Sequence, residues 1–158
     1  MSKPGEEGIA GAFEDIPVLI VVTIATGIFL FSLVHAYVVY LEQLESQRMY
    51  ENANDLLSSV RSYEGLTHEF REGVFLGDKL ITLTSEALRE DYDPNVLGFD
   101  YQISIIDTSD YPNCVNYTMS FSSIEEPPTK NRYSVTTSIS IKVDEDYHAG
   151  QLIVMIWG

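Results

Sequence analysis

The sequence has few of the residues that disulfide, zinc or nucleic-acid chemistry requires. Among 158 residues Cys114 is the single cysteine, so an internal disulfide, a cysteine-based zinc site and a CxxC redox pair are all excluded. Basic residues are also scarce, because 9 Lys and Arg stand against 24 Asp and Glu, which gives a net charge of −15. Nucleic-acid phosphates require a basic face, so this charge argues strongly against nucleic acid as a partner.

Motifs that carry catalysis are missing as well. The chain has no P-loop and no GxGxxG, HExxH or GxSxG pattern. His68 and His148 are far apart in the sequence and have no evident nucleophile beside them. We therefore expect that the protein is not an enzyme and that it holds no cofactor.

Acidic clusters resemble calcium loops only superficially. The run 91–95 is similar to the start of an EF-hand loop, but Val96 and Gln102 stand where such a loop needs Gly and Glu. Looser pairs such as Asp107 with Asp110 are interpreted as solvated turns, the usual role of scattered acids. No metal site is predicted.

What the sequence does contain is a run of 24 residues without charge, PVLIVVTIATGIFLFSLVHAYVVY, over 17–40. As a helix rising 1.5 Å per residue it would extend about 36 Å, enough to cross a hydrocarbon core of about 30 Å. A signal peptide has a shorter apolar core behind a basic start, whereas Lys3 is the one base in residues 1–16. The pattern predicts a transmembrane helix over 17–40, with Pro17 in its first turn, behind an N-terminal arm or leader over 1–16.

Small residues within this run offer a surface for packing against another helix. They are Thr23, Ala25, Thr26, Gly27 and Ser32. Helices in lipid associate through small residues, close packing and occasional polar groups. The pattern predicts self-association through the apolar helix, although side chains that only face lipid would give the same sequence.

Three residues near the end of the run are typical of a membrane interface: His35, Tyr37 and Tyr40. Tyrosine is enriched where a helix leaves the bilayer, and His35 is near enough to that end to contact headgroups. An ionisable group inside a membrane can also mark a proton relay. We favour the role of interfacial anchors over proton chemistry.

The helix is expected to continue beyond the membrane over 41–63. The segment has no proline, and apolar residues recur in it every three to five positions, at Leu41, Leu44, Met49, Ala53, Leu56 and Val60. This spacing predicts one helix from about Asp15 to Ser62, with an apolar first half and an amphipathic second half.

Residues 64–158 are predicted to form a β-rich domain. Alternation of apolar and polar residues indicates strands over 99–108, 114–121, 133–143 and 151–157, arranged as an antiparallel meander. Brief strands at 74–76 and 79–81 and a helical turn at 84–89 precede them. One face of this small antiparallel sheet covers the amphipathic half of the long helix, so the expected fold class is α+β.

The charge distribution bears on where this domain lies. Beyond Tyr40 the chain has 20 acidic against 8 basic residues, about −12, so anionic headgroups would repel the domain. Flanking basic residues are too few to fix the orientation. The acidic β-rich character and the sequon at Asn116, a candidate glycosylation site, favour an extracytoplasmic domain.

At the level of architecture the chain resembles archaeal type IV pilin-like proteins. The resemblance rests on three stretches, VLIVVTIATGIFLFSLV, YLEQLESQRMYENANDLLSSV and SVTTSISIKVDEDYHAGQLIVMIWG. It implies a subunit that is stored in the cell membrane and then packs its helix into a filament or pseudopilus core. Its partners would be other pilin-like subunits or assembly-platform proteins. Glu6 and Glu7 replace the basic leader of that family, which favours a minor or accessory subunit.

Two functions stay open beside a third possibility, a component of a membrane enzyme complex that would co-purify with catalytic subunits. The first is a pilin-like structural subunit of a surface filament or secretion assembly. The second is a single-span, membrane-anchored binding or stator-like module that does not polymerise. In both cases the protein is expected in the cell membrane, crossing it once.

Overall fold

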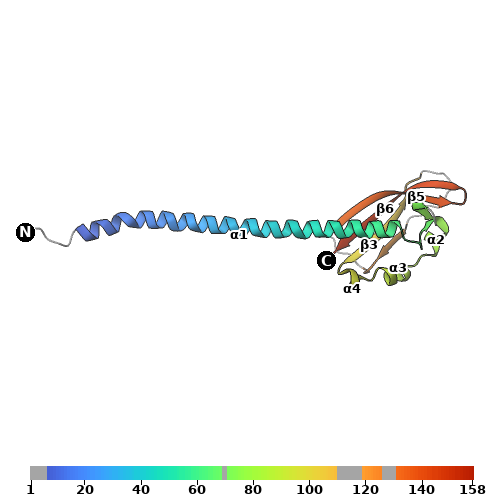
Figure 1. Ribbon diagram of the computed structural model, residues 1–158, viewed down its shortest axis with the longest axis horizontal. Coiled ribbons are helices and arrows are strands. Elements are labelled where there is room, and N and C mark those ends of the chain that lie inside the picture. The colour runs from blue at the N-terminus through green and yellow to red at the C-terminus, as the bar shows by residue number, and fades with distance from the viewer. Residues whose placement is uncertain (1–6, 69–70, 110–118, 126–130) are drawn as a thin grey trace, which may run out of the picture. The chain divides into compact units, whose positions relative to one another are not determined.

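The computed structural model describes residues 7–68, 71–109, 119–125 and 131–158, with side chains from Ile16 onward. The chain divides into two compact units, Met1–Glu45 and Ser46–Gly158. Helix α1 (Glu7–Arg61) runs through both, and every strand belongs to the second unit (Figure 1). The α+β class predicted from the sequence is confirmed.

Helix α1 begins earlier than expected and ends where expected. Its first residue is Glu7 rather than a residue near Asp15, so part of the expected N-terminal arm is helical. Pro17 therefore lies inside the helix and not in its first turn. Proline removes one backbone hydrogen bond, but the residues before it include Ala10 and Ala12, and alanine is the strongest helix former.

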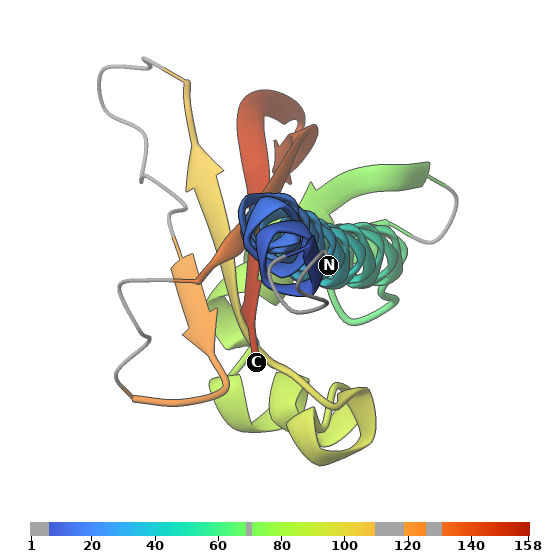
Figure 2. The same ribbon diagram turned by 90° about the vertical axis from the view of Figure 1, so that its left-hand side faces the viewer.

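Within the described residues, six strands form one sheet in the order β1-β2-β5-β6-β3-β4. They are β1 (Thr67–His68), β2 (Arg71–Leu76), β3 (Asp100–Asp107), β4 (Met119–Ser122), β5 (Tyr133–Val143) and β6 (Asp146–Trp157). Figure 2 shows β4, in orange, at one edge and β2, in green, toward the other.

The strands predicted over 74–76, 99–108, 133–143 and 151–157 are found, but the meander is wrong. Strand β6 lies between β5 and β3 and is antiparallel to both, with Val154 opposite Val135 and Ile103. The most apolar strand thus takes the centre of the sheet, where strands on both sides complete its hydrogen bonds. Strand β2 joins parallel to β5, with Phe75 opposite Ile141, so the sheet is mixed rather than wholly antiparallel. Of the strand expected over 114–121, the described part begins at Met119.

Three short helices connect β2 to β3: α2 (Gly77–Thr82), α3 (Ser85–Asp91) and α4 (Pro94–Leu97). The helical turn expected at 84–89 is α3, whose N-cap Thr84 accepts a hydrogen bond from the Ala87 N–H. The strand expected at 79–81 is wrong, because these residues lie in α2. The sequence Lys79-Leu80-Ile81 is short enough to fit a strand or a helix. In the helix Leu80 is buried in the core, whereas Ile81 is exposed.

The core lies between the sheet and the last four turns of α1. Ala53, Leu56 and Val60 are 0%, 4% and 0% exposed and belong to one cluster with the inward-facing residues of β3, β5 and β6. The expected apolar stripe is therefore real, but it is fully buried only from Ala53 onward. Its first members, Leu41 and Leu44, are 45% and 44% exposed.

Candidate functional site

The apolar segment, defined here as residues 16–44 of α1, is exposed on all sides. Within the described residues one helix, Ile16–Arg61, is long and apolar enough to cross a membrane, and none of its most apolar window is buried. Core helices of soluble proteins can be as apolar, but they are covered by the rest of their chain. This segment therefore suits an apolar environment that the chain itself does not supply.

Hydroxyl groups in the apolar segment are satisfied within the helix. Thr23, Thr26 and Ser32 each donate a hydrogen bond to the carbonyl oxygen four residues earlier, at 2.8, 2.8 and 2.9 Å. Such back-bonding removes the cost of placing a hydroxyl in lipid. These side chains therefore need neither water nor a polar partner.

The small residues predicted to form one packing face lie on two. With 3.6 residues per turn, positions three and four apart share a face, which groups Thr23, Thr26 and Gly27. Ala25 and Ser32, seven residues apart, share the opposite face. At Gly27 an added Cβ would meet nothing within 4 Å, so this face is open to a neighbour.

The three predicted anchors lie toward the C-terminal end of the apolar segment, and all three are exposed. The ring of His35 stacks on Phe31, with centroids 6.4 Å apart and planes inclined by 3°. Tyr37 and Tyr40 are 61% and 54% exposed. Their role at an interface stays a prediction.

A buried pair in the second unit was not found from the sequence. His148 of β6 donates a hydrogen bond from Nδ1 to Oδ2 of Asp107 of β3 at 2.9 Å. The two side chains are 3% and 0% exposed. The two residues are 41 positions apart in the sequence. Strand alternation places each of them on the core face of its own strand, but only the pairing of β3 with β6 brings them together.

Hydrogen bonds control the charge of Asp107. Burial alone raises the pKa of this carboxyl group, but hydrogen bonds from His148 and from the hydroxyl and backbone N–H of Ser109 outweigh burial. The pKa of Asp107 is therefore below its ordinary value. The carboxylate is charged at neutral pH and held in one position.

This pair is built for structure rather than for catalysis. The Ser109 hydroxyl donates to Asp107 and not to the imidazole, so the order of a Ser-His-Asp triad is not reproduced. Neither side chain is accessible to a substrate. The Asp107 carboxylate considered above as a calcium ligand is already occupied, and the described residues contain no group of three or more His, Cys, Asp or Glu that could hold a metal.

Polar contacts join the residues that follow α1 to helices α2 and α3. The Tyr63 hydroxyl donates to Asp91, and this hydrogen bond is the main reason that the pKa of Tyr63 is raised to about 12. Lys79 of α2 donates to the carbonyl oxygens of Glu64 and Thr67 at 2.7 and 3.0 Å. Lys79 borders a polar hollow of about 600 Å³, but its ammonium group is bound to these carbonyls and does not stand free for a ligand.

The side of the sheet that faces away from the core carries no charge over its central strands. We call this surface the outer face. It consists of Gln102, Ser104, Ile106, Ser120, Ser122, Ser134, Thr136, Ser138, Ser140, Gln151, Ile153 and Met155. Asp100 and Lys142 carry the nearest charges along these strands and lie at opposite ends.

The glycosylation candidate Asn116 and the single Cys114 lie outside the described residues. For the whole chain, no family model, no curated protein and no solved structure gives a match. The function is therefore argued from two surfaces, the apolar segment of α1 and the outer face of the sheet.

Proposed function

We propose that the chain is a pilin-like structural subunit, held in the cell membrane by the apolar segment and able to pack with other subunits through it. The observation that supports this most is the contrast within one unbroken helix. Leu44 and the apolar residues before it are exposed, whereas Ala53, Leu56 and Val60 are buried under the sheet of their own chain.

This division suits a subunit that moves from lipid into a helical bundle. Both environments are apolar, so replacing lipid by neighbouring helices changes the solvation free energy of the segment little. Close packing of small residues then decides whether the helices associate. The face of Thr23, Thr26 and Gly27 is the stronger candidate because it groups three small residues within four positions and Gly27 is open. The second unit remains folded in either state, because its core needs only residues 46–158.

The test is the location of the protein in cells that produce it. Surface filaments are sheared from the cells, and the chain is measured by mass spectrometry in the filament and membrane fractions. We expect it in both fractions, with the filament form either intact or shortened at its N-terminus. Recovery from membranes alone would overturn the proposal in favour of the stator-like anchor that never polymerises.

A further inference from the structure

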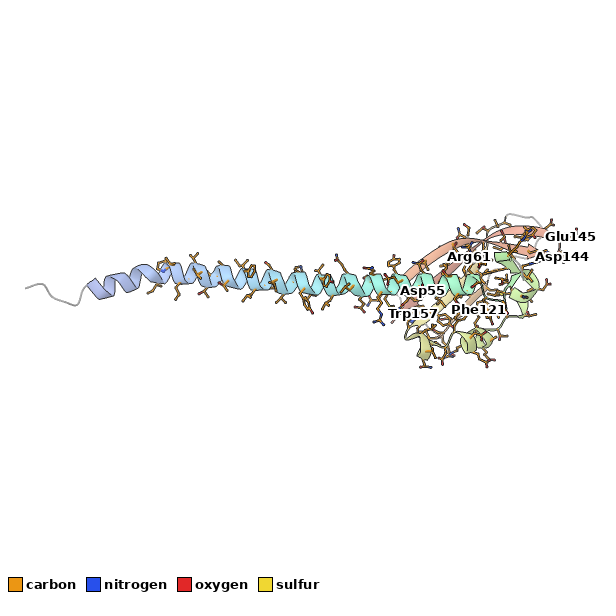
Figure 3. All side chains as sticks on the ribbon, viewed as in Figure 1. Asp55, Arg61, Phe121, Asp144, Glu145 and Trp157 are labelled. Carbon is orange, nitrogen blue, oxygen red and sulfur yellow. The ribbon has the colours of Figure 1, made fainter. Side chains whose placement is uncertain are left out.

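The outer face differs from the rest of the second unit in charge. Residues 46–158 contain 18 acidic and 8 basic residues, a net charge of −10, whereas the outward side of β5 and β6 is uncharged from Ser134 to Ser140 and from Gln151 to Met155. At the β4 edge Arg89 and Glu125 line a hollow beside the outer face. The carboxylates lie elsewhere, as Figure 3 shows for Asp144 and Glu145 at the turn between β5 and β6. Solvent-facing sides of sheets usually carry charges that prevent association.

The arrangement within the outer face is that of an interface. Ile153 and Met155 lie on the central strand β6, and the residues opposite them on either side are polar: Ser104 and Thr136 flank Ile153. On the edge strand, Ser120 accepts a hydrogen bond from Gln102 at 2.7 Å and contacts Ser104 at 3.2 Å. An apolar centre within a polar, hydrogen-bonded rim is the usual anatomy of a protein–protein contact.

We propose that the outer face binds the outer face of a second copy of this chain, sheet against sheet. Two domains of charge −10 repel each other through most of their surfaces, and a patch without carboxylates is where this repulsion is least. A basic partner would instead be attracted to the acidic surfaces and would gain nothing electrostatically here. The inference rests on the proposed function in one respect, since the shared membrane brings the copies together with their apolar segments parallel.

The experiment uses the full chain in membranes, with Cys114→Ser as background. Ser134→Cys, Thr136→Cys and Ser138→Cys are tested one at a time, because these are the exposed outward positions in the first half of β5. The reagent is a bismaleimide with a spacer of about 10 Å, the separation of packed sheets. Glu145→Cys, at the exposed β5–β6 turn, is the control for random collision. Thr26→Cys reports contacts of the apolar segment in a separate reaction, in which a membrane-soluble oxidant joins two thiols directly because a thiol in lipid reacts poorly with maleimide.

We expect at least one β5 cysteine to give a covalent dimer at severalfold the yield of Glu145→Cys. The dimer should be lost when Ile153→Glu is added, while emission of the single Trp157 remains that of the folded domain. Dimers from Thr26→Cys with none from β5 would overturn this inference and leave the proposed function standing. Dimers from β5 with none from Thr26→Cys would support this inference, and the filament fractions would then decide the proposed function separately.

Labelling with a monofunctional maleimide identifies a different occupant. If the β5 cysteines give no dimer and are also protected from labelling in cells, another molecule covers the outer face. That result contradicts the second copy as its partner. If they give no dimer and label fully, the outer face is free, and the inference is equally wrong.

Discussion

At the scale of single residues, the second unit places a hydrogen-bonded pair, Asp107 and His148, inside its core. The Asp107 carboxylate is fully buried, and its pKa is lowered by hydrogen bonds from His148 and Ser109. Removing one partner of a buried pair is costly because the other is left without its hydrogen bonds. In the sequence, His148 could be described only as a histidine with no evident nucleophile beside it. Its partner could not be predicted, because the contact depends on β6 lying beside β3.

We predict that Asp107→Asn destabilises the second unit by about 1–3 kcal/mol at neutral pH. A carboxyl whose folded pKa lies below its ordinary value of 3.8 stabilises the fold above that value. This stability is lost as the pH falls through the folded pKa. The difference between the two proteins should therefore shrink below pH 3.8. Urea unfolding followed by Trp157 emission measures it at each pH.

The control is Asp144→Asn, the same change at an exposed turn residue with φ of 53°. Asparagine tolerates that conformation, so this variant should unfold like the parent. Equal effects at the two positions would contradict the role given to Asp107.

At the scale of elements, sequence periodicity predicted the long helix, its buried stripe and strand β5 with both its ends. It failed where tertiary context decides the structure. The three residues 79–81 fit a strand or a helix equally well by sequence, and the order of the strands depends on which strand gains most from a central place. The small residues of the apolar segment were recognised, but their division between two faces appears only when the helical period is applied to each of them.

The division of α1 into an exposed and a buried half gives a matched pair of substitutions. Leu56→Ala should destabilise the second unit by about 2–5 kcal/mol, because Leu56 is 4% exposed and its removal leaves a cavity. Leu44→Ala makes the same change in the same stripe at a residue that is 44% exposed. It should change the free energy of unfolding by less than about 0.5 kcal/mol. Urea unfolding in detergent, followed by Trp157 emission, compares them.

At the scale of the whole molecule, one acidic chain carries two surfaces that we propose as contacts with other copies. The apolar segment exposes apolar side chains that are unfavourable in water, and the outer face has uncharged side chains. Apart from Glu42 near the end of the apolar segment, both surfaces lack the carboxylates that keep the rest of the protein apart from its copies. Assembly is then favoured only where these surfaces meet.

Gly27→Leu should reduce recovery of the chain in sheared filaments by about tenfold, while the amount in membranes stays the same. The added side chain enters open space within its own chain, so it does not strain the helix. Against a neighbour it overpacks the contact at a cost of about 1–3 kcal/mol. Ala25→Leu, on the opposite face, is the control and should leave recovery unchanged. Equal losses would contradict the choice of face.

The most direct test of the central claim is the reactivity of single cysteines toward an aqueous maleimide in opened membranes. Thr26→Cys lies in the apolar segment and Glu145→Cys at the β5–β6 turn, both in the Cys114→Ser chain. The account predicts full labelling at position 145 and almost none at position 26 until detergent and denaturant are added. Rapid labelling at position 26 without them, from a chain that is soluble and monomeric, would contradict it.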